Sequence, residues 1–258
     1  MKKYLLSGLS ILSVLIITAC GENNTTPLKY PVTLTFSHLV THQGLETGVI
    51  KYINAAGNEF SVEKLQYIVS EIQLLRSDGQ EVSLTEGYHF IDISKNDTFS
   101  FLADQDIEWG AYEGISMVFG LREDKNLSGQ YPDLNALSWS WPEMLGGGYH
   151  FMKLEGRFIN AQGNIATYTT HMGTAREITV TDTLFHDNSA LLSLGCPEFT
   201  LQSPVEINIE MDIAQWYDNP HSWNLDTLSN MIMPLFHAQQ TLRDNAHDVF
   251  SIGEITTN

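Results

Sequence analysis

The most regular feature of this chain is an alternation of apolar and polar residues that repeats over many short segments. In residues 204–213, one face carries Val205, Ile207, Ile209, Met211 and Ile213. The positions between them are acidic or amide residues. Residues 31–40 alternate in the same way and place His38 on the apolar face, between Phe36 and Val40. A period of two predicts strands with one buried face.

Further strands are predicted for residues 65–76, 88–93, 111–121, 149–159, 165–172 and 176–184. Asp78-Gly79 between two apolar runs is a strong hairpin signal. Helix is scarce: residues 61–69 fit a helix or a strand, and residues 224–245 have helical spacing interrupted by Pro234. Many short strands without a long repeat predict an all-β chain, a single-domain β-sandwich or barrel-like fold with a few short helices.

Residues 1–19 have the composition of a secretory signal peptide. Lys2 and Lys3 precede an apolar stretch that is too short to span a membrane. Small residues then lead to Cys20, and the sequence Ile-Thr-Ala-Cys resembles the bacterial lipobox, in which the cysteine is acylated and becomes the first residue of the mature protein. An ordinary signal peptide with an accidental cysteine is the alternative.

The residues after Cys20 predict where the mature protein resides. Gly21 stands where an aspartate would signal retention in the inner membrane, so a host with two membranes would place this lipoprotein in the outer one, facing the periplasm or the cell surface. Residues 20–30 are polar and suit a flexible tether behind the lipid anchor. Residues 31–258 are then the folded domain.

The net charge and the cysteine content limit the kinds of binding partner that the chain can have. The chain has 13 Lys+Arg against 31 Asp+Glu, and removal of residues 1–19, with two lysines and no acid, changes the net charge from −18 to −20. Such a surface disfavours nucleic acid and anionic membranes and favours cations or basic partners, although solubility alone also explains it. If Cys20 carries lipid, Cys196 lacks an intrachain disulfide partner and is a buried thiol, an intermolecular partner or a soft metal ligand.

Histidines are the candidate chemical groups, since the chain has no G-x-S-x-G, P-loop, H-E-x-x-H or C-x-x-C motif. His38 and His150 fall on the apolar side of predicted strands, and His171 follows the next hairpin. Each could be a hydrogen-bonded core histidine. We expect the three to converge on a metal, and thioethers of Met152 or Met172 nearby favour copper over calcium or magnesium. The role of His237 stays open.

Trp139-Ser140-Trp141 is followed by a glycine-rich turn, Tyr-His-Phe-Met-Lys-Leu-Glu-Gly at 149–156 and His-Met-Gly at 171–173. This combination resembles the MbnP-like family of secreted copper-binding proteins, which are associated with methanobactin systems and related to the methanotroph copper proteins CorA and MopE. The similarity extends over roughly residues 31–252. His171 matches the family's H-x-G, and His150 matches the variable position of its G-Y-x-F motif. The chain lacks the family's further paired cysteines.

The resemblance implies a β-rich extracytoplasmic protein that holds one copper ion with histidine ligands. It also implies that a tryptophan, here Trp139 or Trp141, is oxidised to kynurenine by a di-haem partner enzyme of the cytochrome c peroxidase type, MbnH. We therefore expect a copper-binding lipoprotein for acquisition, storage or delivery, without catalysis of its own. The alternatives are a surface lipoprotein that recognises a glycan or a protein without metal, and an enzyme that uses histidine and carboxylate as acid and base.

Overall fold

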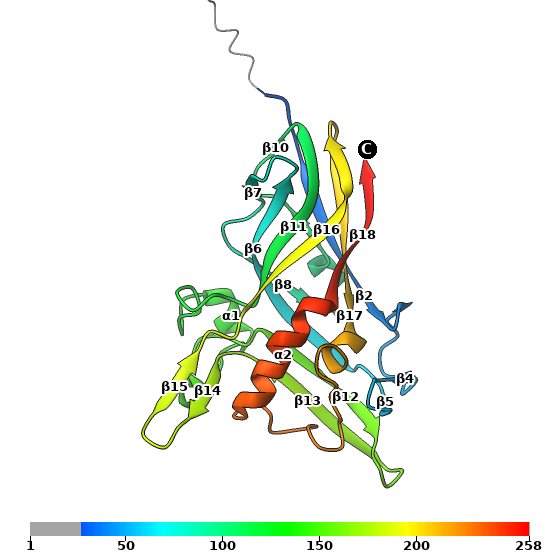
Figure 1. The fold of residues 1–258 in the computed structure, drawn as a ribbon, viewed down its shortest axis with the longest axis vertical. Helices are drawn as coiled ribbons and strands as arrows, with labels where there is room; N and C mark the ends of the chain where they lie inside the picture. The colour runs from blue at the N-terminus through cyan, green and yellow to red at the C-terminus, as the bar shows by residue number, and fades with distance from the viewer. Residues whose placement is uncertain (1–26, 258) are drawn as a thin grey trace, which may run out of the picture.

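The computed structural model describes residues 27–257 as two curled β-sheets, each like half of a barrel, that face one another across an apolar core (Figure 1). The larger sheet contains β4 (Tyr52–Ile53), β5 (Glu59–Phe60), β6 (Lys64–Arg76), β7 (Glu81–Ser83), β8 (Tyr88–Asp92), β11 (Gly110–Phe119), β12 (Met152–Ile159), β13 (Ile165–Met172) and β16 (Ala190–Leu201). Its main path runs β16-β11-β6-β12-β5-β4. The predicted all-β class is confirmed.

The smaller sheet contains β2 (Val32–Val40), β3 (Gln43–Gly44), β9 (Ser100–Leu102), β17 (Val205–Asp212) and β18 (Phe250–Thr257). Its central pair, β2 and β17, is parallel and joins the two ends of the chain. Two short ribbons are separate: β1 (Lys29–Tyr30) with β10 (Ile107–Glu108), and β14 (Ala175–Ile178) with β15 (Thr183–His186). The β14–β15 ribbon projects from the lower left of Figure 1.

The helices are few and short, as expected: α1 (Pro132–Ala136), α2 (Phe236–Val249) and the 3-10 turns η1 (Asn96–Thr98), η2 (Glu143–Leu145) and η3 (Ile213–Tyr217). Helix α2 crosses in front of the strands in Figure 1 and buries Leu242 and Val249. No helix in residues 27–257 has the length and apolar character that a membrane span requires. The predicted signal peptide and the acylation of Cys20 lie outside the described residues.

Alternation predicted the sheet interior well. In β2 every second residue from Val32 to Val40 is buried, because side chains of a strand point to opposite faces in turn. The Asp78-Gly79 turn closes the β6–β7 hairpin, and Gly79 adopts the positive φ that the turn requires. Residues 61–69, left between helix and strand, belong largely to β6.

Two predicted elements were wrong in extent. The helix expected over 224–245 begins only at Phe236, because Pro234 lacks the N–H that a helix interior needs and residues 224–228 form a turn instead. The single strand expected over 176–184 is a hairpin, in which Thr179 and Asp182 close the turn between β14 and β15. Strand β16 was missed because Leu191, on its outward face, disguises the alternation.

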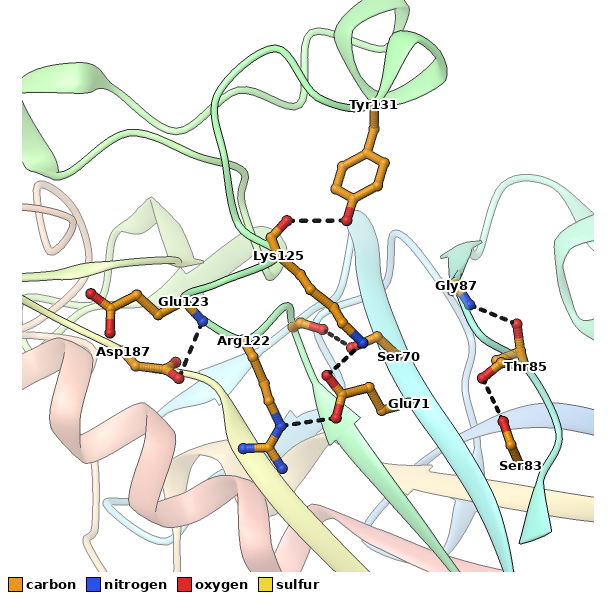
Figure 2. Close-up of polar contacts among 11 residues, drawn as sticks. Ser70, Glu71, Ser83, Thr85, Gly87, Arg122, Glu123, Lys125, Tyr131 and Asp187 are labelled. Atoms are coloured by element: carbon orange, nitrogen blue, oxygen red, sulfur yellow. Dashed lines mark hydrogen bonds and ion pairs between the residues drawn. The ribbon is translucent and has the colours of Figure 1, made fainter.

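A bulge in β6 anchors the loop that leads toward the tryptophan segment. Glu71 has φ +49°, where β6 holds one residue more than its partner β11. Its carboxylate forms ion pairs with Arg122 at 2.9 Å and with Lys125 at 3.1 Å. Both contacts are drawn in Figure 2. The Lys125 carbonyl in turn accepts a hydrogen bond from the hydroxyl of Tyr131 at 3.1 Å. These contacts fix residues 122–131, which precede α1.

Candidate metal centre

Two histidine rings meet at the end of strands β12 and β13. The ring centroids of His150 and His171 are 5.4 Å apart, with the planes nearly perpendicular. Nδ1 of His150 lies 2.9 Å from the carbonyl oxygen of Trp139, and Nε2 of His171 lies 2.9 Å from a carboxylate oxygen of Glu155. Each ring is therefore held through one nitrogen by an oxygen acceptor.

The acceptors determine which nitrogen of each ring keeps a lone pair. A carbonyl oxygen can only accept, so Nδ1 of neutral His150 carries the proton and Nε2 is free. The carboxylate of Glu155 likewise takes the proton-bearing Nε2 of His171, which leaves Nδ1 free. Neither free nitrogen makes a hydrogen bond with another residue of the described chain. Histidines that bind metals are oriented in this way by a carbonyl or carboxylate behind them.

Electrostatics keep both rings neutral. Burial lowers the pKa of His150 to about 3, and the nearby charge of Lys153 adds to the effect. Burial also lowers the pKa of His171, although the hydrogen bond to Glu155 opposes this. Burial raises the pKa of Glu155, but the hydrogen bond from His171 and the charge of Lys64 lower it by more. The pair thus presents two unprotonated imidazole nitrogens and an ionised carboxylate at neutral pH.

The histidine pair lies on the outer face of the large sheet. Lys153 is directly opposite His171 across β12 and β13, so these side chains leave the same face. Met152 is opposite Met172 and points into the core instead. We expected His150 to share the face of Met152; that expectation was wrong, because β12 begins at Met152 and the alternation does not reach back to His150.

Both tryptophans of the Trp-x-Trp segment cover this outer face. The Trp141 ring stands edge-on to His150 at 4.9 Å between centroids, and the Trp139 ring is 5.5 Å away. Both indoles are 1% exposed. Gly173 makes room for Trp141, since a Cβ atom there would lie 2.5 Å from the indole ring. That contact gives a physical reason for glycine in the H-x-G sequence.

The two indoles differ in their polar surroundings. Nε1 of Trp141 donates to the carbonyl oxygen of Leu145 at 3.3 Å. Nε1 of Trp139 is buried and has no hydrogen-bond partner among residues 27–257. The ammonium of Lys153 lies 4.5 Å above the Trp139 ring centroid, within the range of a cation–π contact.

His38 lies apart from this pair. It points into the core, where Nε2 is 3.1 Å from the hydroxyl of Tyr67 and the ring packs against Phe99 at 5.3 Å. Tyr67 is opposite Met152, so it occupies the face of the sheet that looks away from His171. The expected convergence of three histidines is therefore not observed. Within residues 27–257, no three side chains of His, Cys, Asp or Glu are grouped closely enough to hold a metal ion.

The remaining candidate residues from the sequence, Cys196 and His237, lie elsewhere in the fold. Cys196 is half-buried on β16, and burial raises the pKa of its thiol. His237 is exposed on the first turn of α2. Glu155 and Lys153 were missed by sequence reasoning, although both alternate with the apolar residues of β12 and so had to share the outer face. That alternation was the available signal.

The fold and this face define a β-rich protein with a shielded histidine pair beside two buried tryptophans. A sequence profile of the MbnP family matches residues 29–234, and the chain belongs to that family. The solved structure of MbnP from Methylosinus trichosporium superposes with a TM-score of 0.59 over 88% of this chain and 99% of that chain, at 14% identity. A search of curated proteins gave no match.

Proposed function

We propose that this chain is an extracytoplasmic copper-binding protein for copper acquisition, storage or delivery, with no catalysis of its own. The observation that carries the proposal is the His150–His171 pair, in which each ring is held from behind and keeps one free nitrogen. Imidazole nitrogen suits copper, whereas calcium and magnesium prefer oxygen. Membership of the MbnP family supports the same conclusion.

The surroundings of the pair fit a bound copper ion. Trp139 and Trp141 pack against His150 and shield it from water, and the unpartnered Nε1 of Trp139 is a buried polar group that nothing in residues 27–257 satisfies. The described chain supplies two imidazoles and no third His, Cys, Asp or Glu ligand. A third donor made from a neighbouring tryptophan completes the set, since a kynurenine provides an aromatic amine and a carbonyl that an intact indole lacks.

Trp141 is the better candidate for this oxidation. Loss of an electron makes an indole positive, and the Lys153 ammonium 4.5 Å from Trp139 opposes that charge. The Trp141 Nε1–H instead points at a carbonyl oxygen, which stabilises a positive ring. A di-haem peroxidase partner would withdraw the electrons from the indole in this oxidation. Peptide mapping of protein from the native host tests this: kynurenine at Trp139 alone, or intact indoles at both positions, contradicts it.

Copper content tests the central proposal. The chain, purified from a periplasm with and without a co-expressed di-haem peroxidase, is analysed for bound metals, and His171→Phe is the matched variant because it keeps a ring of similar size. We expect about one copper per chain, absent from His171→Phe. A metal-free wild type in both preparations favours the rival function, recognition of a glycan or protein by a surface lipoprotein.

The place of action is proposed from the sequence. Cys20 would carry the lipid, and the residues between it and β1 would tether the domain to a membrane, with the outer membrane favoured; Lys29 and Tyr30, expected in the tether, pair with β10 instead. Cys20→Ser should move the protein from the membrane fraction to the soluble periplasm, while Cys196→Ser, the matched control, should leave it in place. Wild-type protein that is already soluble would rule out the anchor.

A further inference from the structure

A cavity of about 440 Å³ opens beside His171. Its wall is mainly apolar and comes from two segments, η2 and the loop that precedes α2, and His171 and Arg176 contribute polar groups. Three methionines line it: Met144, Met231 and Met233. The cavity therefore joins the outer face of β13 to solvent.

The distribution of methionines singles out this cavity. Met117, Met152, Met172 and Met211 are fully buried in the core, where a flexible thioether is an ordinary filler. Within residues 27–257, all the other methionines line this one cavity. Met144 and Met231 are 73% and 79% exposed, although burial would stabilise such side chains. Core packing does not explain three thioethers in this position.

The loop before α2 carries Met231 and Met233 and is called the methionine loop here. Polar contacts fix it against β13. The backbone N–H of Thr169 donates to the carbonyl of Ser229 at 2.7 Å. The buried amide of Gln239 donates to the carbonyl of His171 at 2.9 Å and lies 3.4 Å from that of Ile232. Met231 itself has φ +59°, a conformation unfavourable for a side chain of this kind. The surrounding structure thus holds the loop, and its methionines, beside His171.

We propose that Met144, Met231 and Met233 form a transient site for a soft monovalent cation, Cu(I) or its analogue Ag(I), on the route to His171. Thioether sulfur binds Cu(I) and rejects hard cations such as calcium and magnesium. Arg176 donates from Nη1 to the Met144 carbonyl at 3.1 Å, which steadies the rim, and its charge weakens cation binding there. Weak binding suits passage of an ion rather than storage. The inference deepens the proposed function, on which its His171 end rests.

Silver binding at the thioethers is tested by NMR on the chain labelled with ¹³C at the methionine methyl groups. The chain carries Cys20→Ser and Cys196→Ser, so that no thiol competes for silver. We expect Ag(I) to shift the methyl signals of Met144, Met231 and Met233, each assigned with a single Met→Leu variant. The signals of Met117 and Met211, which are fully buried on β11 and β17 and do not line the cavity, are internal controls. Shifts in none of the three, or equally in the controls, overturn the inference.

Transfer to the histidines is tested by stopped-flow loading from a Cu(I) donor. The triple variant Met144→Leu, Met231→Leu and Met233→Leu keeps the size and apolar character of these side chains. We expect the variant to lose the fast phase of loading and to reach the same final copper content. Unchanged kinetics overturn the route, because sulfur is then not needed for access.

The two proposals fail separately in these experiments. Silver shifts at the methionines in a chain that never retains copper would remove the copper function and leave the thioether site. Copper retained through His171 without any methionine shift would do the reverse. His171→Phe should keep the silver shifts of the three methionines, since that site does not use the imidazole.

Discussion

His38 and His150 are both buried, and burial lowers the pKa of the first to about 4 and of the second to about 3. They differ in what their rings face. His38 bonds to the Tyr67 hydroxyl, and burial raises the pKa of that phenol, so Tyr67 keeps its proton. His150 bonds through Nδ1 to a main-chain carbonyl, and the ring of a second histidine, His171, lies 5.4 Å away.

The comparison shows that burial and a lowered pKa are shared by a histidine bonded within the core and by one that keeps a free ring nitrogen beside a second imidazole. A phenol can donate or accept and fits a core histidine, whereas a fixed acceptor on one nitrogen combined with a free lone pair on the other prepares a ring for metal. The second imidazole within 5.4 Å completes the distinction. Four predictions test it, in order of decreasing effect.

The largest effect is expected from removal of a ring of the pair. His150→Ala and His171→Ala should each weaken copper binding by more than about 100-fold, beyond the usual effect of losing a residue that only orients a ligand. His38→Gln keeps a polar partner for Tyr67 and should bind copper like the wild type. Competition with a copper chelator measures all three. Equal losses in His38→Gln and His150→Ala would erase the difference between the two histidines.

Loss of the Glu155 carboxylate, which holds the His171 ring, should have the next largest effect on copper binding. Glu155→Gln removes the charge that orients the ring and should weaken copper binding by about 10- to 100-fold. The matched control is Glu177→Gln, whose carboxylate lies 2.8 Å from Nε2 of His186 elsewhere on the surface. Equal affinities in the two variants would mean that Glu155 does not position the site.

Packing of Trp141 over the His150–His171 pair should affect copper binding less. Gly173→Ala forces a Cβ atom to 2.5 Å from the Trp141 ring and should lower the free energy of unfolding by about 1–3 kcal/mol. In Gly195→Ala the new Cβ meets nothing within 4 Å, so this change is the matched control. Denaturant unfolding measures both. If Gly173→Ala is as stable as the wild type and binds copper equally well, the packing of Trp141 against Gly173 is not needed for stability or for copper binding.

The smallest effect on copper binding is expected from His38, whose contribution shows in the pH dependence of folding stability. His38 has a lowered pKa in the folded state, so the unfolded chain binds the extra proton between about pH 4 and 6.5, and folding stability falls as the pH is lowered through that window. Removal of this group in His38→Gln should flatten the slope by up to about 1.4 kcal/mol per pH unit. Urea unfolding at several pH values measures it. An unchanged slope would mean that His38 is protonated in the core.

Sequence reasoning predicted the sheets better than the site, because alternation depends on neighbours in the chain whereas the site depends on which strands pair. Period two correctly placed His38 in the core of β2. The same rule misplaced His150, which lies two residues outside the strand it was counted in. Pairing of Lys153 with His171 could not be read from either segment alone.

The methionine loop illustrates the same limit. Residues 224–245 have helical spacing, but Pro234 and the contacts of Gln239 with His171 and Ile232 keep the first part as a loop. Helix propensity depends on the residues of this segment alone and does not include its contacts with the edge of β13. Prediction of Met231 and Met233 beside His171 would have required the tertiary contacts first.

The parallel pairing of β2 with β17 also bears on when the chain can fold. Hydrogen bonds here join Thr35 to Asn208, 173 residues apart, so the first long strand has no partner in its sheet's centre until most of the chain has been synthesised. Contacts of such long range slow folding, because a large loop must close before they form. A chain built this way completes its fold late, which is compatible with the proposed export, since a translocation channel admits only extended polypeptide.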